Sequence, residues 1–236
     1  MGMSNNGRKN NGANGKDLKV VGKPFRKVDA RAKCVGQTKF ADDIVLPRML
    51  YAKLLRSHEP HAIIKSIDTS KALAVPGVFA VITGKDLPIP YGILPVSQDE
   101  HTLSVERVRF IGDPVAAVAA VDEDTAFDAM NLIEVEYEKL NTITSIEEAV
   151  MIDEPRIHEY GDAGNVHKKI NLEFGDMDEG FAEADLIRED VFFYEGNTHL
   201  PMEQHAAIAH YDADNKLTLW SSTQTPHYVH RALAKV

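Results

Sequence analysis

The sequence predicts an α+β fold in which helices pack on β-sheets. The clearest indication is the stretch from Pro114 to Tyr137. Residues 114–122 are almost wholly apolar, as expected of a strand covered on both faces. Acidic residues then open a helix, where the helix dipole favours them. Ile133, Val135 and Tyr137 alternate with glutamates, which is typical of a half-buried strand.

The length of 236 residues favours two globular units, since one domain holds roughly 150 residues. Residues 1–23 are rich in Asn, Gly and Lys and lack apolar periodicity, so we expect a disordered tail. The first unit should cover residues 24–140. Its patterns predict strands at 49–57, 61–69 and 78–84, and a short helix at 70–77 that Pro76 and Gly77 end.

Residues 141–169 are predicted to be a connector, with Ser145 and Glu148 forming a capping box for a short helix. The second unit, residues 170–236, should hold a short helix at 176–184 and an extended strand at 186–200. A hairpin should follow, turning across residues 213–215.

A last helix is predicted to start at Pro226, with Thr225 as its cap. Its apolar positions keep helical spacing up to Val236, and no terminal glycine or polar cap follows. We therefore expect the 236 residues to be the first part of a longer polypeptide, whose second unit is incomplete here.

Charge and composition exclude several classes of function. The net charge of −10 argues against a nucleic-acid or anionic membrane surface as partner. No run approaches the ~20 apolar residues of a spanning helix, and the N-terminus lacks the apolar core of a secretory signal, so we expect a cytoplasmic protein. A single cysteine, Cys34, excludes an internal disulfide and a cysteine-rich metal site. Redox chemistry must then come from a bound cofactor or from other subunits.

Two histidine pairs are possible metal ligands. His227 and His230 lie at i and i+3 on the last predicted helix, and His199 lies six residues before His205. Neither pair has a third ligand at suitable spacing, so we predict no metal-ligating residue. Glu203, beside apolar strand residues, is predicted to be a buried, paired structural acid rather than a general base. The remaining polar candidates are predicted to be a turn between strands, His58 and His61, and a solvated strand face, Glu134 and Glu136.

Gln224 is the most informative polar residue. It follows an apolar strand and directly precedes the start of a helix, where backbone N–H groups converge. Its carboxamide can donate a hydrogen bond to an oxyanion or a metal-oxo group without adding charge. Taken alone, a glutamine in a strand-turn-helix is common and predicts no function.

Three blocks of the first unit, residues 27–44, 54–88 and 108–126, resemble the N-terminal hammerhead domain of the molybdenum hydroxylases. This is the xanthine dehydrogenase and aldehyde oxidase family, in its large molybdopterin-binding subunit. Residues 174–187, 199–209 and 219–230 resemble the opening of the adjoining molybdenum-cofactor domain. The resemblance implies a hammerhead-type α/β domain followed by the start of an α+β cofactor domain.

Within the family, residues 91–120 and 223–230 are most similar to the alpha subunits of 4-hydroxybenzoyl-CoA reductases. This similarity implies reductive removal of a phenolic hydroxyl to give benzoyl-CoA, in anaerobic degradation of aromatic compounds, with a ferredoxin as electron donor. Two alternatives stay open. One is an oxidative hydroxylase of the same family, acting on an aldehyde, a purine, nicotinate or carbon monoxide. The other is a non-catalytic module that assembles subunits.

The family resemblance also implies the cofactor. It is molybdenum held by the dithiolene of a molybdopterin, as the cytosine dinucleotide, with iron–sulfur and FAD subunits as partners beside the rest of the large subunit. By its place in the Ser-Thr-Gln motif, Gln224 resembles the glutamine that hydrogen-bonds an oxo ligand of the molybdenum. The family's glycine-rich loop and catalytic glutamate fall downstream of Val236, so these 236 residues alone are predicted to be inactive.

Overall fold

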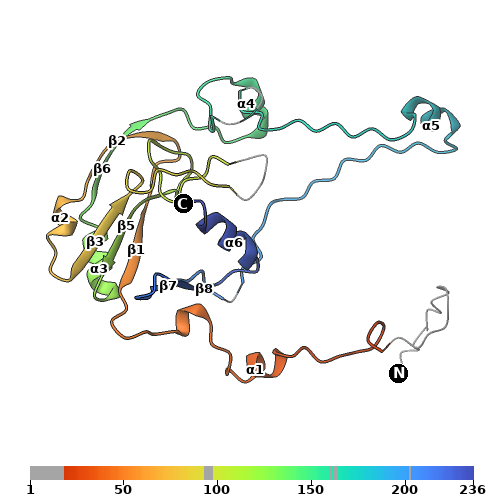
Figure 1. Cartoon of the computed structure of the whole chain (residues 1–236). Coiled ribbons are helices and arrows are strands. Elements are labelled where there is room, and N and C mark those ends of the chain that lie inside the picture. Colours follow the sequence, from red (N-terminus) through yellow and green to blue (C-terminus); the bar gives the residue numbers. More distant parts are fainter. Residues whose placement is uncertain (1–18, 93–97, 160, 162–163, 202) are drawn as a thin grey trace.

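The computed structural model describes residues 19–92, 98–159, 161, 164–201 and 203–236. Most of the predicted N-terminal tail lies outside these residues. The described chain forms a body of strands and helices, from which a long extended loop leads out to α5 and back (Figure 1). In chain order the elements of the body up to the loop are α1 (Ala30–Cys34), a 3-10 turn (Ala41–Asp43), β1 (Tyr51–Arg56), β2 (Ala62–Asp68), α2 (Ser70–Leu73), β3 (Val78–Thr83), β4 (Arg107–Val108), β5 (Pro114–Ala120), α3 (Glu123–Met130), β6 (Glu134–Lys139) and α4 (Ile146–Met151).

The first sheet has the order β1-β5-β3, and both pairings are antiparallel. The central strand β5 is the predicted apolar run, and Val115, Ala116, Val118 and Ala120 are fully buried in it. Helix α3 packs on β1 and β5. It begins where the sequence predicts, because the Asp122 carboxylate accepts a hydrogen bond from the backbone N–H of Thr125 at 2.8 Å.

The second sheet has the order β4-β2-β6, again antiparallel. Strand β6 shows the predicted alternation, with Val135 and Tyr137 half-buried and the glutamates exposed. Ile67 and Val135 pack against the buried residues of both sheets. The two sheets therefore share one continuous core, which joins the residues predicted as the first unit.

The connector is fastened to this core by arginines. Arg107 donates to the carbonyl of Arg156 at 2.7 Å, and Arg109 donates to the carbonyl of Ile157 at 2.8 Å. The Ser145 hydroxyl accepts from the N–H of Glu148, as predicted, whereas the Glu148 carboxylate reaches the N–H of Thr144 rather than that of Ser145. The predicted capping box is therefore half formed, at the start of α4.

Residues 170–201, which we call the extended arm, leave the body after the connector. The predicted helix is present as α5 (Met177–Glu183), capped by Asp176. The predicted strand at 186–200 is wrong in one respect: the chain is extended there but pairs with no other described strand. A strand needs a partner for its backbone groups, and the described residues supply none.

The hairpin and the last helix return to the body. Strands β7 (Ala207–Tyr211) and β8 (Leu217–Ser221) pair as the sequence predicts, and β7 contacts the 3-10 turn near the start of the body. Helix α6 (Pro226–Leu233) starts at the predicted proline, although the Thr225 side chain makes no capping bond. No helix among the described residues is long and apolar enough to cross a membrane.

Candidate functional site

Gln224 lies in the turn that joins β8 to α6. The turn is shaped by Thr223, whose hydroxyl accepts from the N–H of Thr225 at 3.1 Å and lies 3.2 Å from its hydroxyl. These bonds hold the residues on either side of Gln224, whose own side chain is exposed. Its carboxamide has no hydrogen-bond partner within the part of the chain that the structure describes. The donor that the sequence singled out is therefore presented, uncommitted, on an ordered turn.

The exposed carboxamide of Gln224 is a neutral hydrogen-bonding group. A carboxamide offers two N–H donors and one acceptor and carries no charge. The adjoining N-terminus of α6 adds a positive electrostatic end, although this is a short helix. Among the described residues Gln224 lines neither of the two pockets described for the chain, so the turn by itself does not form an enclosed binding site.

Neither of the two histidine pairs belongs to a cluster of metal-ligating side chains among the described residues. His227 and His230 are exposed on α6, and His199 and His205 are exposed in and after the extended arm. Among the described residues, no three His, Cys, Asp or Glu side chains are placed to hold one metal ion.

The prediction for Glu203 is wrong. Its side chain is exposed rather than buried, and among the described residues it makes no ion pair within 4 Å. Its charge still acts on Lys33, the pKa of which is raised mainly by the hydrogen bond to Asp29 and in smaller part by Glu203. Its described neighbours Pro201 and Ala207 are exposed as well, which is why hydrophobic context misjudged its burial.

The turn between β1 and β2 is confirmed, and it is more buried than a simple turn. Glu59 is buried, and its Oε1 forms an ion pair with Lys139 Nζ at 2.9 Å. Nε2 of the exposed His58 lies 3.3 Å from the same oxygen. His61 is buried and its Nδ1 donates to the carbonyl of Asn141 at 2.9 Å. The turn therefore ties the end of β6 and the start of the connector to β1 and β2.

Tyr137 completes this region. The His58 ring meets it edge to face, with centroids 5.4 Å apart. Burial is the main cause that raises the pKa of the Tyr137 phenol. The Glu134 and Glu136 side chains on the same strand are exposed, as predicted, and pair with Lys71 and Ser66.

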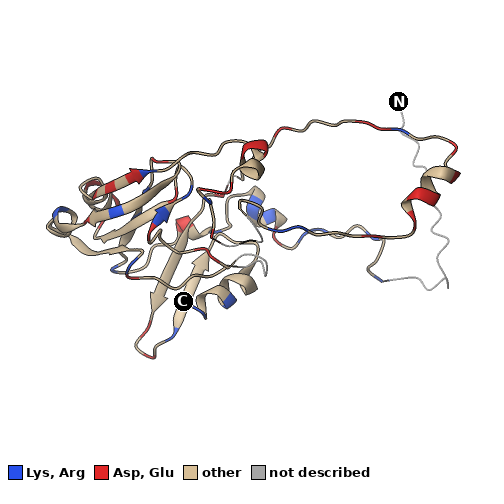
Figure 2. Cartoon of the chain, turned by 90° about the horizontal axis from the view of Figure 1, so that it is seen from above, with Lys and Arg blue, Asp and Glu red and all other residues tan. Residues whose placement is uncertain are grey.

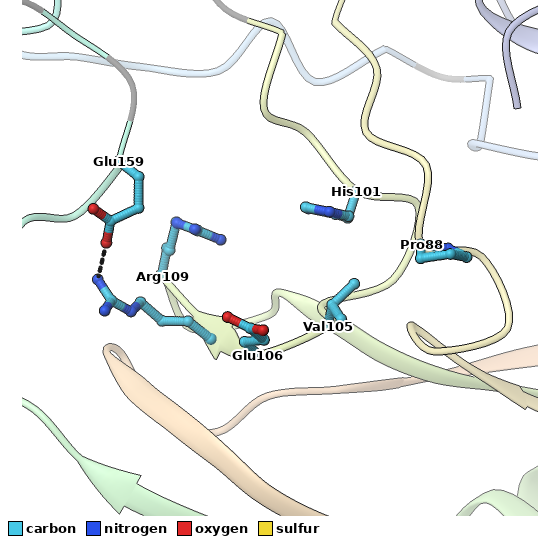
Figure 3. A pocket seen from close by; sticks show the side chains of 7 residues that line it. Pro88, His101, Val105, Glu106, Arg109 and Glu159 are labelled. Atoms are coloured by element: carbon cyan, nitrogen blue, oxygen red, sulfur yellow. Dashed lines mark ion pairs between the residues drawn. The ribbon is translucent and has the colours of Figure 1, made fainter.

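A polar pocket of about 350 Å³ opens beside β4 and the connector (Figure 3). Arg109 and Glu159 stand on one side, and His101 and Pro88 stand opposite, with Glu106 and Val105 between them. Arg107 pairs with Glu159 at 3.2 Å, so two arginines are balanced by two glutamates. None of the residues singled out as site candidates from the sequence lines this pocket.

Sequence reasoning missed the arginines of this region. Arg107 and Arg109 are two residues apart, so an extended chain projects both to the same side. That spacing was the available signal. A third arginine, Arg156, lies in the connector itself and donates from Nε to the carbonyl of Gly164 at 2.9 Å. Its Nη2 is buried and has no hydrogen-bond partner among the described residues.

Comparison with known proteins gives two matches, which leave residues 142–156 between them. Residues 35–141 match the family model of the aldehyde oxidase and xanthine dehydrogenase a/b hammerhead domain. Residues 157–236 match the molybdopterin cofactor-binding domain. Gln224 falls within the second match.

Individual relatives agree with these matches. The chain is 42% identical over 214 residues to the nicotinate dehydrogenase large molybdopterin subunit of Eubacterium barkeri, covering 91% of this chain and 50% of the relative. It is 35% identical over 217 residues to the carbon monoxide dehydrogenase large chain of Afipia carboxidovorans, covering 85% of this chain and 27% of that one. The crystal structure of quinoline 2-oxidoreductase from Pseudomonas putida 86 superposes with a TM-score of 0.77 at 32% identity, covering 89% of this chain and 28% of that chain. The chain thus spans half, or less than a third, of the proteins it resembles.

Proposed function

Because this chain belongs to the aldehyde oxidase and xanthine dehydrogenase family, we propose that it is the N-terminal portion of the molybdopterin-binding subunit of a molybdenum-dependent oxidoreductase. The observation that carries the proposal is the pair of adjoining domain matches, in the chain order that the sequence predicted. Bound molybdopterin would supply two-electron redox chemistry at molybdenum, which this chain's own side chains cannot provide.

Within that enzyme we assign Gln224 to the cofactor. Its exposed carboxamide, held on the turn between β8 and α6, would donate a hydrogen bond to an oxo group of the molybdenum centre and polarise it. The hammerhead core and its arginine-fastened connector would hold this turn in place. The catalytic glutamate is expected on polypeptide outside these 236 residues.

For the substrate we propose oxidation of a nitrogen-containing aromatic ring. The supporting observations are the 42% identity to a nicotinate dehydrogenase subunit and the similarity to quinoline 2-oxidoreductase. Reductive dehydroxylation of 4-hydroxybenzoyl-CoA, favoured by the sequence motifs, stays the second candidate. Both place iron–sulfur and FAD subunits beside this one, and a pterin in its cytosine dinucleotide form; the reductive candidate adds a ferredoxin donor.

The test begins with the native complex purified from its host. Metal analysis should find close to one molybdenum per chain, together with iron on partner subunits. Assays would then compare nicotinate plus an electron acceptor with 4-hydroxybenzoyl-CoA plus a reduced ferredoxin. Turnover of the CoA thioester alone would reverse our choice of substrate, and a complex without molybdenum would leave only the assembly module.

Gln224 can be tested in the same complex without relying on activity. Gln224→Ala should shift the electron paramagnetic resonance signal of Mo(V) while the molybdenum content stays the same. His227→Ala, three residues along on α6, is the matched control and should leave the signal unchanged. An unaltered spectrum in Gln224→Ala would remove this residue from the cofactor.

A further inference from the structure

The polar pocket beside β4 presents hydrogen-bond donors from two opposite walls. Figure 3 shows the Arg109 guanidinium and the His101 ring pointing toward one another across it. Arg109 donates from Nε to the carbonyl of Ile157, and its two terminal nitrogens have no hydrogen-bond partner among the described residues. The His101 ring likewise makes no hydrogen bond within the part of the chain that the structure describes. Both side chains can therefore donate to a group that enters the pocket.

Arg109 is held in position before any ligand binds. Its backbone N–H donates to the Asp113 carboxylate at 2.9 Å, and the bond from Nε to Ile157 fixes the guanidinium plane. A planar guanidinium recognises a carboxylate through two parallel N–H bonds. Because the plane is already fixed, binding costs little additional ordering of this side chain.

The charges around the pocket favour a ligand with a single negative charge. Arg107 pairs with Glu159 at 3.2 Å and donates to the carbonyl of Arg156, so it adds no net charge. The Glu106 carboxylate lines the pocket, forms no ion pair within 4 Å with any described residue, and would repel a second negative charge. Figure 2 shows basic residues interspersed with acidic ones over the body, so the described chain offers a polyanion no continuous basic face.

The rest of the lining limits the size and polarity of the ligand. Pro88 and Val105 give the pocket two apolar surfaces beside its polar groups. Its volume of about 350 Å³ lies near the lower end of the range for small-molecule sites, roughly 300–1,000 Å³. A carboxylate attached to one apolar ring matches both the size of the pocket and its mixed lining.

We propose that this pocket binds a small organic monocarboxylate whose body is a single apolar ring. The carboxylate accepts hydrogen bonds from the terminal nitrogens of Arg109 and from His101, and the ring lies against Pro88 and Val105. Because Arg109 also holds the carbonyl of Ile157, the ligand lies where β4 meets the connector. The proposal goes beyond the proposed function and can stand or fall without it, since no contact involves the molybdenum cofactor.

The test uses the full 236-residue chain, labelled with nitrogen-15, and benzoate as the probe. Titration is followed by nuclear magnetic resonance, and the shifts should be largest at the Nε of Arg109 and at the amides of His101 and Val105. A ligand of this size should bind with a dissociation constant of about 1 mM. Absence of shifts at these three positions up to about tenfold that concentration would overturn the proposal.

Three other compounds separate the sources of recognition. Benzamide has the shape of benzoate without its charge, propionate is the carboxylate of an acidic side chain without the ring, and inorganic phosphate is a different anion. Each should bind at least about tenfold more weakly than benzoate. Equal binding of benzamide would refute recognition of the charge. Equal binding of propionate would assign the pocket to an acidic side chain of a polypeptide, and tighter binding of phosphate would make it a phosphate site, so either would also overturn the proposal.

Arg109→Lys keeps the charge but removes the planar pair of donors, so it should weaken benzoate binding by about tenfold. Arg56→Lys is the matched control, because Arg56 also donates to a backbone carbonyl, that of Gly112 at 2.9 Å, and does not line the pocket. The control should leave binding unchanged. Equal losses in the two variants would show that the effect is structural and would refute the role of Arg109.

Glu106→Gln supplies a test with the opposite sign. It removes the like charge from the pocket and should strengthen benzoate binding severalfold, an effect that a folding defect would not produce. His101→Ala removes the opposite donor and should weaken binding severalfold. Weaker or unchanged binding in Glu106→Gln, or unchanged binding in His101→Ala, would contradict the placement of the carboxylate.

Discussion

Truncation of Val118 to alanine tests whether the core of the hammerhead unit is the cluster described above. Val118 lies at the centre of β5, is fully buried, and packs with Ala116, Ala129 and Ile133. Removing two methyl groups costs about 1.6 kcal/mol of transfer free energy at ~0.8 kcal/mol each. The cavity left among small neighbours raises the total to about 2–3 kcal/mol.

The assay is urea unfolding followed by far-ultraviolet circular dichroism. With a slope of about 1–3 kcal/mol per molar urea, the midpoint should fall by roughly 1 M. Val191→Ala makes the same chemical change at a site that is 95% exposed, and its midpoint should stay within the error of the unaltered chain. Equal midpoints for the two variants would refute this account of the core.

Three further changes probe the backbone, a cap and the connector. A Cβ at Gly84 would lie 2.4 Å from a backbone carbonyl oxygen, so Gly84→Ala should lower the free energy of unfolding by about 1–3 kcal/mol in urea. Gly180→Ala places its Cβ in open space and should not lower it; equal effects of the two variants would contradict the clash. The hydrogen bond from the N–H of Thr125 holds the pKa of the Asp122 carboxyl below its usual 3.8. The stability that this cap contributes is therefore present above pH 3.8 and is lost as the pH falls through the lower pKa of the folded state. Asp122→Asn should flatten this acid dependence in unfolding curves, and an unchanged pH profile would count against the cap. Arg107→Ala should speed proteolysis of the connector severalfold, and an unchanged cleavage rate would show that its carbonyl bond is dispensable.

Local patterns predicted most of the elements. The apolar run of β5, the acidic start of α3, and Pro226 at the first position of α6 act through neighbouring residues, so one sequence suffices to find them. The hairpin between β7 and β8 is equally local, with its turn at the predicted residues 213–215.

The errors concern features that depend on distant residues. The pairing of β1 with β5 could not be predicted from the sequence, because no local pattern connects residues so far apart in the chain. Glu203 was predicted to be buried from its apolar neighbours, yet burial depends on what packs against those neighbours. The strand at 186–200 has the right composition, but its partner lies in no described part of this chain.

The surroundings of the candidate site were predicted in part for the same reason. The turn that carries Gln224 was predicted because a strand, a turn and a helix start follow one another directly in the sequence. The arginines that fasten the connector were missed, because their carbonyl partners are nearly fifty residues away.

The pairing order of the two sheets sets when this unit can fold. Strand β1 pairs with β5, where Tyr51 lies opposite Ala120, and strand β2 pairs with β6, where Ala62 lies opposite Lys139. The earlier strand of each pair cannot form these bonds until the later strand has been synthesised. Contacts this distant in sequence make folding slow, on the scale of milliseconds to seconds. At about 5–20 residues per second, several seconds pass between synthesis of the first strand and the last. The first sheet cannot be complete until Ala120 has left the ribosome, and the second cannot be complete until Lys139 has left it, so the apolar strands already made depend on chaperones or on one another until then.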